Sequence, residues 1–96
     1  MHESKQARQQ AWISFEVAMR FVRDEKLRAE IMAHPEPMRG DPPYLAHARA
    51  CRTKCLKLGV ATEADAFSLL ERCLRRLSRF TTLVHYRLRK AASRRG

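Results

Sequence analysis

His47, Cys51 and Cys55 are the residues in this chain whose types and spacing come closest to a metal site. Their four-residue spacing places them on one side of a helix, and imidazole with thiolate suits zinc. Two helical turns nevertheless separate the outer pair by about 12 Å along the axis, which is too far for one tetrahedral ion. Free cysteine also packs as a small hydrophobic residue. We therefore expect core packing at these positions and no metal or other cofactor.

A nucleophilic Cys–His pair is the other chemistry that the residue types permit, for example Cys55 or Cys73 with His85. Covalent catalysis also needs groups that stabilise the developing charge, and the sequence offers no nucleophile elbow or glycine-rich loop to supply them. It also contains no GxGxxG, Walker-type or HExxH motif. We expect a protein that is not an enzyme, with Cys73 in or beside the core.

Positive charge is concentrated at the C-terminal end of the chain. The net charge is +10, and the last 25 residues contain nine Lys/Arg and no Asp or Glu. Residues 1–71 contain eleven Lys/Arg and ten acids. Such asymmetry indicates contact with nucleic acid, an anionic membrane surface or an acidic protein.

The C-terminal cations recur on one side of an expected helix. Like charges four residues apart on a helix repel each other, so a face that serves only solubility usually carries both acidic and basic residues. This face carries basic residues alone. Arginine outnumbers lysine there by eight to one, which favours bidentate contact with phosphate or carboxylate groups. The expected binding residues are Arg72, Arg75, Arg76, Arg79, Tyr86, Arg87, Lys90 and Arg94, and Arg49, Arg52, Lys54 and Lys57 offer an extension of the surface.

The elements that must position these residues are all helices. The composition favours an all-α fold, and we expect a compact bundle of three to four helices over residues 4–33, 43–58 and 63–94. The first range is either one helix or two abutting ones with a break near 23–25. A proline-rich loop at 35–43 follows, with Asp41 as N-cap of the second helix and Gly59 as its terminator. Thr62 to Asp65 resembles a capping box that starts the third helix.

The core is expected to draw on three apolar sets. Ala11, Phe15, Ala18 and Val22 share one face of the first helix, with Trp12 and Phe21 as further core anchors. Leu27 and Ile31 continue this stripe with an offset of one residue. The third set lies opposite the basic side of the third helix and consists of Phe67, Leu70, Leu74, Leu77, Phe80, Val84 and Leu88. It is expected to be buried through Leu77, and the long helix is expected either to overhang the body or to bend near 78–82.

The chain is expected to form one domain over residues 1–96, with a basic end at 83–96 that projects from it. A homodimer through the long third helix is left open. No apolar run is long enough to cross a membrane, no secretory signal is evident, and three cysteines make no disulfide framework. A cytoplasmic location is the expectation.

The stretch GVATEADAFSLLERCLRRLSRF at residues 59–80 resembles small helical proteins that are encoded with type VI secretion spike components. The shared feature is a helix start with the pattern Gly-aliphatic-x-Thr/Ser-Glu-x-Asp. Those proteins turn acidic near their end, whereas this chain continues as an arginine-rich helix. The resemblance implies a helical accessory protein that binds a partner.

Two functions follow as hypotheses. The first is a small regulatory or accessory protein that binds nucleic acid by phosphate neutralisation, largely independent of sequence, because the chain contains no Asn to read bases. The alternative is an adaptor, inhibitor or chaperone that docks on an acidic protein surface. A membrane partner is disfavoured by the expected burial of the apolar side through Leu77.

Overall fold

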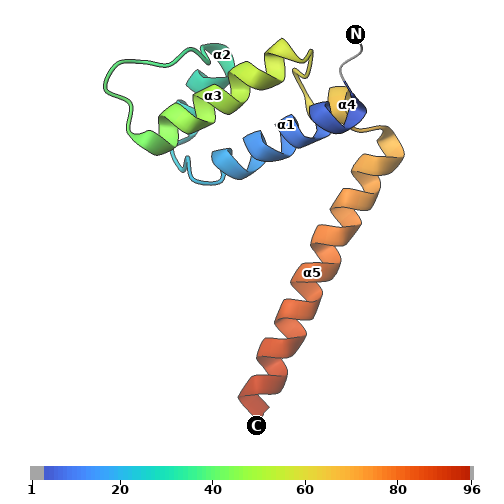
Figure 1. Cartoon of the computed structure of the whole chain (residues 1–96). Coiled ribbons are helices and arrows are strands. Elements are labelled where there is room, and N and C mark those ends of the chain that lie inside the picture. Colours follow the sequence, from blue (N-terminus) through green and yellow to red (C-terminus); the bar gives the residue numbers. More distant parts are fainter. Residues whose placement is uncertain (1–3, 96) are drawn as a thin grey trace. The chain divides into compact units, whose positions relative to one another are not determined.

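The fold is all-α, as expected from the composition (Figure 1). The computed structural model describes the backbone of residues 4–95 and the side chains of residues 4–92, and this part of the chain contains no strand. Its five helices are α1 (Lys5–Met19), α2 (Glu25–Ala33), α3 (Pro43–Lys57), α4 (Glu63–Ala66) and α5 (Leu69–Arg95). The number exceeds the expected three to four because two of the expected helices are interrupted. The chain divides into two units, Met1–Ala66 and Phe67–Gly96.

The first expected helix is two helices, α1 and α2. Ser4 caps α1, and its hydroxyl accepts a hydrogen bond from the Ala7 N–H at 2.9 Å. The chain leaves the helix after Met19 and starts α2 at the N-cap Asp24, whose carboxylate accepts from the Lys26 N–H at 2.8 Å. A new cap therefore accounts for the break and for the one-residue shift of the apolar stripe.

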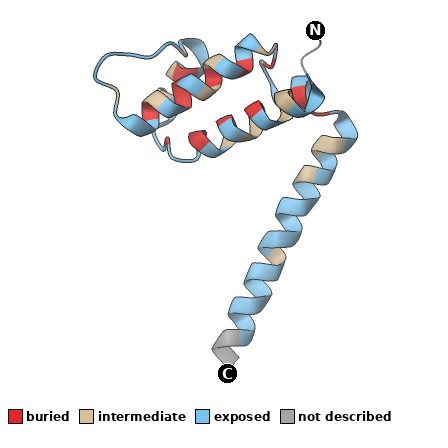
Figure 2. Ribbon diagram, in the orientation of Figure 1, coloured by how far each residue is buried: buried red, intermediate tan, exposed pale blue. Residues whose placement is uncertain are grey.

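The core of the first unit lies between α1, α2 and α3 (Figure 2), and alanine is the commonest residue in it. The four-residue face predicted for the first helix is buried, and Ile31 is fully buried. Cys55 is fully buried, and its thiol donates to the Ala11 carbonyl at 3.3 Å, so α3 is held against α1. Phe21 is 66 % exposed, contrary to its expected role as a core anchor, because it lies in the turn after α1.

The start of α3 differs from the prediction in one respect. Pro42 rather than Asp41 occupies the N-cap, with no side-chain cap, and Pro43 begins the helix. Proline suits this place because its nitrogen carries no hydrogen to leave unpaired. At the other end, Gly59 has φ +78°, the left-handed conformation expected of a helix terminator.

The third expected helix is broken at Phe67–Ser68. Ser68 and Glu71 form a reciprocal capping box: the Ser68 N–H donates to Glu71 Oε1 at 2.8 Å, and the Glu71 N–H donates to Ser68 Oγ at 3.2 Å. This is the Ser-x-x-Glu signature of a helix start, so α5 begins afresh at Leu69. The helix is continuous through 78–82, where a bend was one of the two alternatives: Leu69–Arg95 is one helix, and the Thr82 hydroxyl donates to the Ser78 carbonyl at 2.9 Å.

Candidate partner-binding helix

Helix α5 presents the basic face that the sequence predicted. It contains 27 residues, so it is about 40 Å long at 1.5 Å per residue. After Glu71 it carries no acidic residue. Arg72 and Arg75 are partly exposed, and the other cations of this face whose side chains are described are exposed, namely Arg76, Arg79, Arg87, Arg89 and Lys90. The predicted site residue Arg94 lies outside the residues whose side chains are described.

Two aromatic rings contact cations of this face. The Arg75 guanidinium lies over the Phe67 ring, 4.2 Å from its centroid, and this contact lies within the second unit. The Lys90 ammonium lies 5.9 Å from the Tyr86 ring centroid. Such cation–π contacts orient the long side chains without neutralising them. Tyr86 therefore belongs to the basic face, as predicted.

Arg89 is an exposed cation that the sequence reasoning missed. It lies fourteen residues after Arg75, which is close to four helical turns, so the two share one side of α5. That spacing was the signal available in the sequence.

The apolar side of α5 is exposed, which contradicts the expected burial through Leu77. Leu77 is 60 % exposed and Phe80 is 65 % exposed, and Cys73, expected in or beside the core, is also exposed. The physical reason is the break at Ser68: Phe67, just before it, is buried, whereas Leu70 and the residues after it belong to a separate helix. A membrane surface is therefore no longer disfavoured as a partner. No helix within residues 4–95 has the length and apolar character needed to span a membrane.

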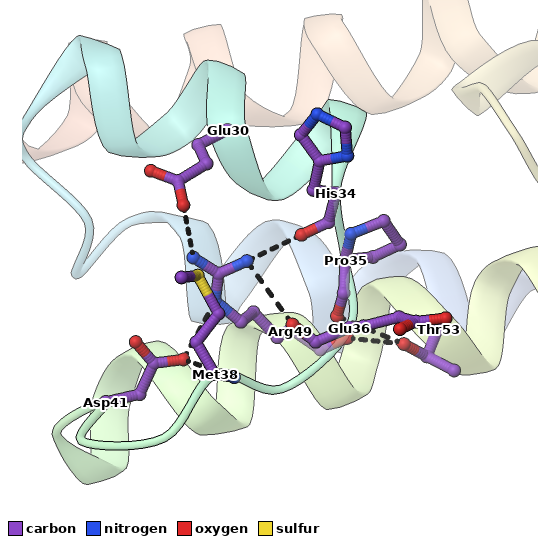
Figure 3. A network of polar contacts seen from close by, with 8 residues as sticks. All are labelled: Glu30, His34, Pro35, Glu36, Met38, Asp41, Arg49 and Thr53. Carbon is purple, nitrogen blue, oxygen red and sulfur yellow. Dashed lines mark hydrogen bonds and ion pairs between the residues drawn. The ribbon is translucent and has the colours of Figure 1, made fainter.

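Arg49 does not extend the basic surface, because its side chain is buried in the first unit (Figure 3). It is 1 % exposed. Its guanidinium donates to Glu30 Oε1 at 3.1 Å and to the carbonyl of His34, while its Nε lies 2.9 Å from Asp41 Oδ2. This residue therefore ties α2, the proline-rich loop and α3 together.

Arg52 is also buried, at 6 % exposure, so its assignment to the binding surface is wrong as well. It donates to the Ala61 carbonyl at 2.8 Å, and its guanidinium lies 5.5 Å from the centroid of the Phe15 ring. Burial of both arginines is tolerated because carbonyl and carboxylate oxygens satisfy the guanidinium groups, while the long stems are aliphatic. Lys54 and Lys57 are exposed.

His47 and Cys51 lie at a groove between α1 and α3. Their Nε2 and Sγ atoms are 3.6 Å apart. The groove encloses about 530 Å³ and is lined mainly by small residues of the two helices, with Lys54 and Leu58 at α3. Cys55 lies in the core instead, where its thiol donates a hydrogen bond to the Ala11 carbonyl. Within the described residues no cluster of three His, Cys, Asp or Glu side chains can hold a metal ion.

Burial disfavours the thiolate form of Cys51, beside this groove, and of Cys55, in the core. Burial raises the pKa of the Cys51 thiol, and nearby Lys54 opposes that rise. Burial likewise raises the pKa of Cys55, against the opposing charge of Arg52. A thiol with a raised pKa is protonated at neutral pH and reacts slowly. This arrangement suits packing rather than thiolate chemistry.

The helix α5 is therefore the site with the clearest chemical character: one exposed basic side and one exposed apolar side.

Comparison of the chain with protein-family models, with curated proteins and with solved structures finds no match.

Proposed function

We propose that this protein is a small non-enzymatic accessory or regulatory protein that binds nucleic acid through the basic face of α5. The observation that supports it most is the set of exposed cations on one side of a continuous helix that carries no acid after Glu71. Phosphate groups along a nucleic acid strand form a matching row of negative charge.

The mechanism is phosphate neutralisation. Each arginine or lysine that replaces a condensed counterion releases it, and this release favours binding strongly at low salt. Guanidinium groups add bidentate hydrogen bonds to phosphate oxygens. The chain contains no Asn, and the basic face has no Gln. Binding is therefore expected to depend weakly on base sequence, because phosphate contacts carry no sequence information.

The test is a titration with duplex DNA and with RNA at several salt concentrations. Contact with about six phosphates predicts a slope of log affinity against log salt near −5. Substitution of Arg76, Arg89 and Lys90 by Gln should weaken binding and make the slope shallower by about 3. The matched control removes three exposed cations from the first unit, Arg20, Arg23 and Arg39, and should leave the slope nearly unchanged.

Absence of binding to either nucleic acid at low salt would refute the proposal. The second candidate, docking on an acidic protein surface, would then take its place, because the same exposed arginines recognise carboxylates. Anionic lipid vesicles serve as a comparison, since an exposed amphipathic helix can also bind a charged membrane surface.

A cytoplasmic location fits this proposal. Cys51, Cys55 and Cys73 are all free thiols, and unpaired cysteines are typical of a reducing compartment.

A further inference from the structure

The exposed apolar side of α5 repeats every seven residues. One series has Leu70, Leu77, Val84 and Ala91, and a second, four residues later, has Leu74, Thr81 and Leu88. Alternating spacings of four and three define the a and d positions of a heptad, the pattern of paired helices in a coiled coil. The first series occupies position d and the second position a. Thr81 is the only polar residue among the seven.

Most cations of α5 lie away from the seam that this repeat defines. In a coiled coil, positions e and g flank the seam and face the partner, whereas b, c and f point outward. Positions e hold Glu71, Ser78, His85 and Ala92, and positions g hold Cys73, Phe80, Arg87 and Arg94, while Arg95 falls at the next position a. The outward positions b, c and f hold the cations Arg72, Arg75, Arg76, Arg79, Arg89 and Lys90.

This distribution decides between an acidic partner and a second copy of the chain. A partner helix of opposite charge would be selected by basic residues at e and g, but six of the cations lie at b, c and f instead. Two identical helices can pair along this seam without bringing rows of like charge together. Their basic faces would then both point away from the partner.

The exposed area is sufficient for such a pair. Leu70, Leu74, Leu77 and Leu88 are each more than half exposed, as is Phe80 beside them. With the smaller residues they expose on the order of 700 Å² of apolar surface, close to the roughly 800 Å² that each partner contributes to a stable interface. That is more than a typical monomer leaves in one patch.

The helix also needs a partner for its own stability. Like charges four residues apart, such as Arg72 and Arg76, weaken an isolated helix. Most helical stability comes from packing of the apolar side. We infer that the a and d side chains of α5 pair with those of a second copy, in a coiled-coil homodimer that presents two basic faces outward.

Sedimentation equilibrium of the full chain tests this inference. We expect a mass of twice 11.2 kDa at micromolar concentration. The double variant Leu70→Asn, Leu77→Asn changes two d positions and should weaken dimerisation a hundredfold or more, because each residue is lost from both chains.

The matched control is Leu69→Asn, Leu83→Asn. These leucines are 69 % and 54 % exposed, much like Leu70 and Leu77 at 69 % and 60 %, but the heptad places them at position c. They should leave the dimer intact. Fluorescence of Trp12, which lies in α1, reports that the first unit is folded in both variants.

A monomeric wild-type chain at 100 µM, roughly the concentration at which weak dimers form, would overturn the inference. An equal loss of association in both double variants would overturn it too. Neither variant changes the charge, so nucleic acid binding can be measured separately: a dimer that binds no nucleic acid refutes only the proposed function. A chain that binds as a monomer refutes only the homodimer.

Discussion

At the scale of single residues, Arg49 shows that the surroundings of a side chain decide whether it is buried or exposed. The sequence offered Arg49 as an extension of the binding surface, and arginine is usually exposed in proteins. In the fold, two carboxylates and the backbone carbonyl of His34 surround its guanidinium (Figure 3). A buried charge is tolerated only when it is paired and hydrogen-bonded in this way. Nothing in the local sequence distinguishes Arg49 from an exposed arginine.

Substitution of Arg49 by Ala should therefore destabilise the protein markedly. The change opens a cavity and leaves the partners of the guanidinium unsatisfied, so we expect a loss of about 3 kcal/mol in the free energy of unfolding. Urea denaturation followed through Trp12 measures it. Arg39→Ala, at an exposed loop position, is the control and should cost less than about 0.5 kcal/mol. Similar small losses in both variants would contradict the structural role of Arg49.

At the scale of helices, short-range hydrogen bonds of side chains decide where each element begins. Asp65 Oδ2 accepts from the backbone N–H groups of Ala61 and Thr62, both at 2.8 Å, at the start of α4. These hydrogen bonds lower the pKa of the Asp65 carboxyl group, and the bond from the Thr62 N–H has the largest effect. Ser68 and Glu71 start α5 in the same manner only a few residues later. Two closely spaced starts explain why residues 63–95 form two helices.

The stability that Asp65 supplies should depend on pH. Because its pKa is lower in the folded state than the ordinary 3.8, the unfolded state binds more protons between these two values. The stabilisation is thus complete above about pH 4 and is lost as the pH falls through the folded pKa. Asp65→Asn should reduce stability at pH 7, and the deficit should be smaller at pH 2.

Urea denaturation at the two pH values checks this prediction. Glu36→Gln, an exposed loop carboxylate, provides the control and should change stability little at either pH. A deficit of Asp65→Asn that persists unchanged at pH 2 would show that ionisation of the carboxyl group is not its cause.

At the scale of the whole molecule, the division into two units predicts two kinds of thermal behaviour. Residues 1–66 contain the buried apolar core, whereas residues 67–96 are mainly one helix with an exposed apolar side. A unit with its own core unfolds independently of concentration, whereas a helix held by a second copy is stabilised by mass action.

Circular dichroism at 222 nm should therefore show two transitions on heating. The transition of α5 should move to higher temperature as the protein concentration rises, while that reported by Trp12 fluorescence stays fixed. Leu70→Asn, Leu77→Asn should remove the concentration dependence, and Leu69→Asn, Leu83→Asn should retain it. A single transition that is independent of concentration would contradict this prediction.

The sequence alone determined the helical fold, most helix ends and the basic face of α5. These features depend on local chemistry: on propensity, on caps such as Ser4 and Gly59, and on the 3.6-residue period that places Arg76 and Arg79 with Lys90. The likeness to type VI secretion accessory proteins and the nucleic acid partner stay predictions.

Only the tertiary structure decided which side chains are buried. Arg49 and Arg52 are buried because oxygens from other segments satisfy their guanidinium groups, and these oxygens are brought to them by the packing of the first unit. Leu77 is exposed because the Ser68 cap begins a separate helix. Burial is a property of neighbours distant in sequence, whereas periodicity records only which residues share a face.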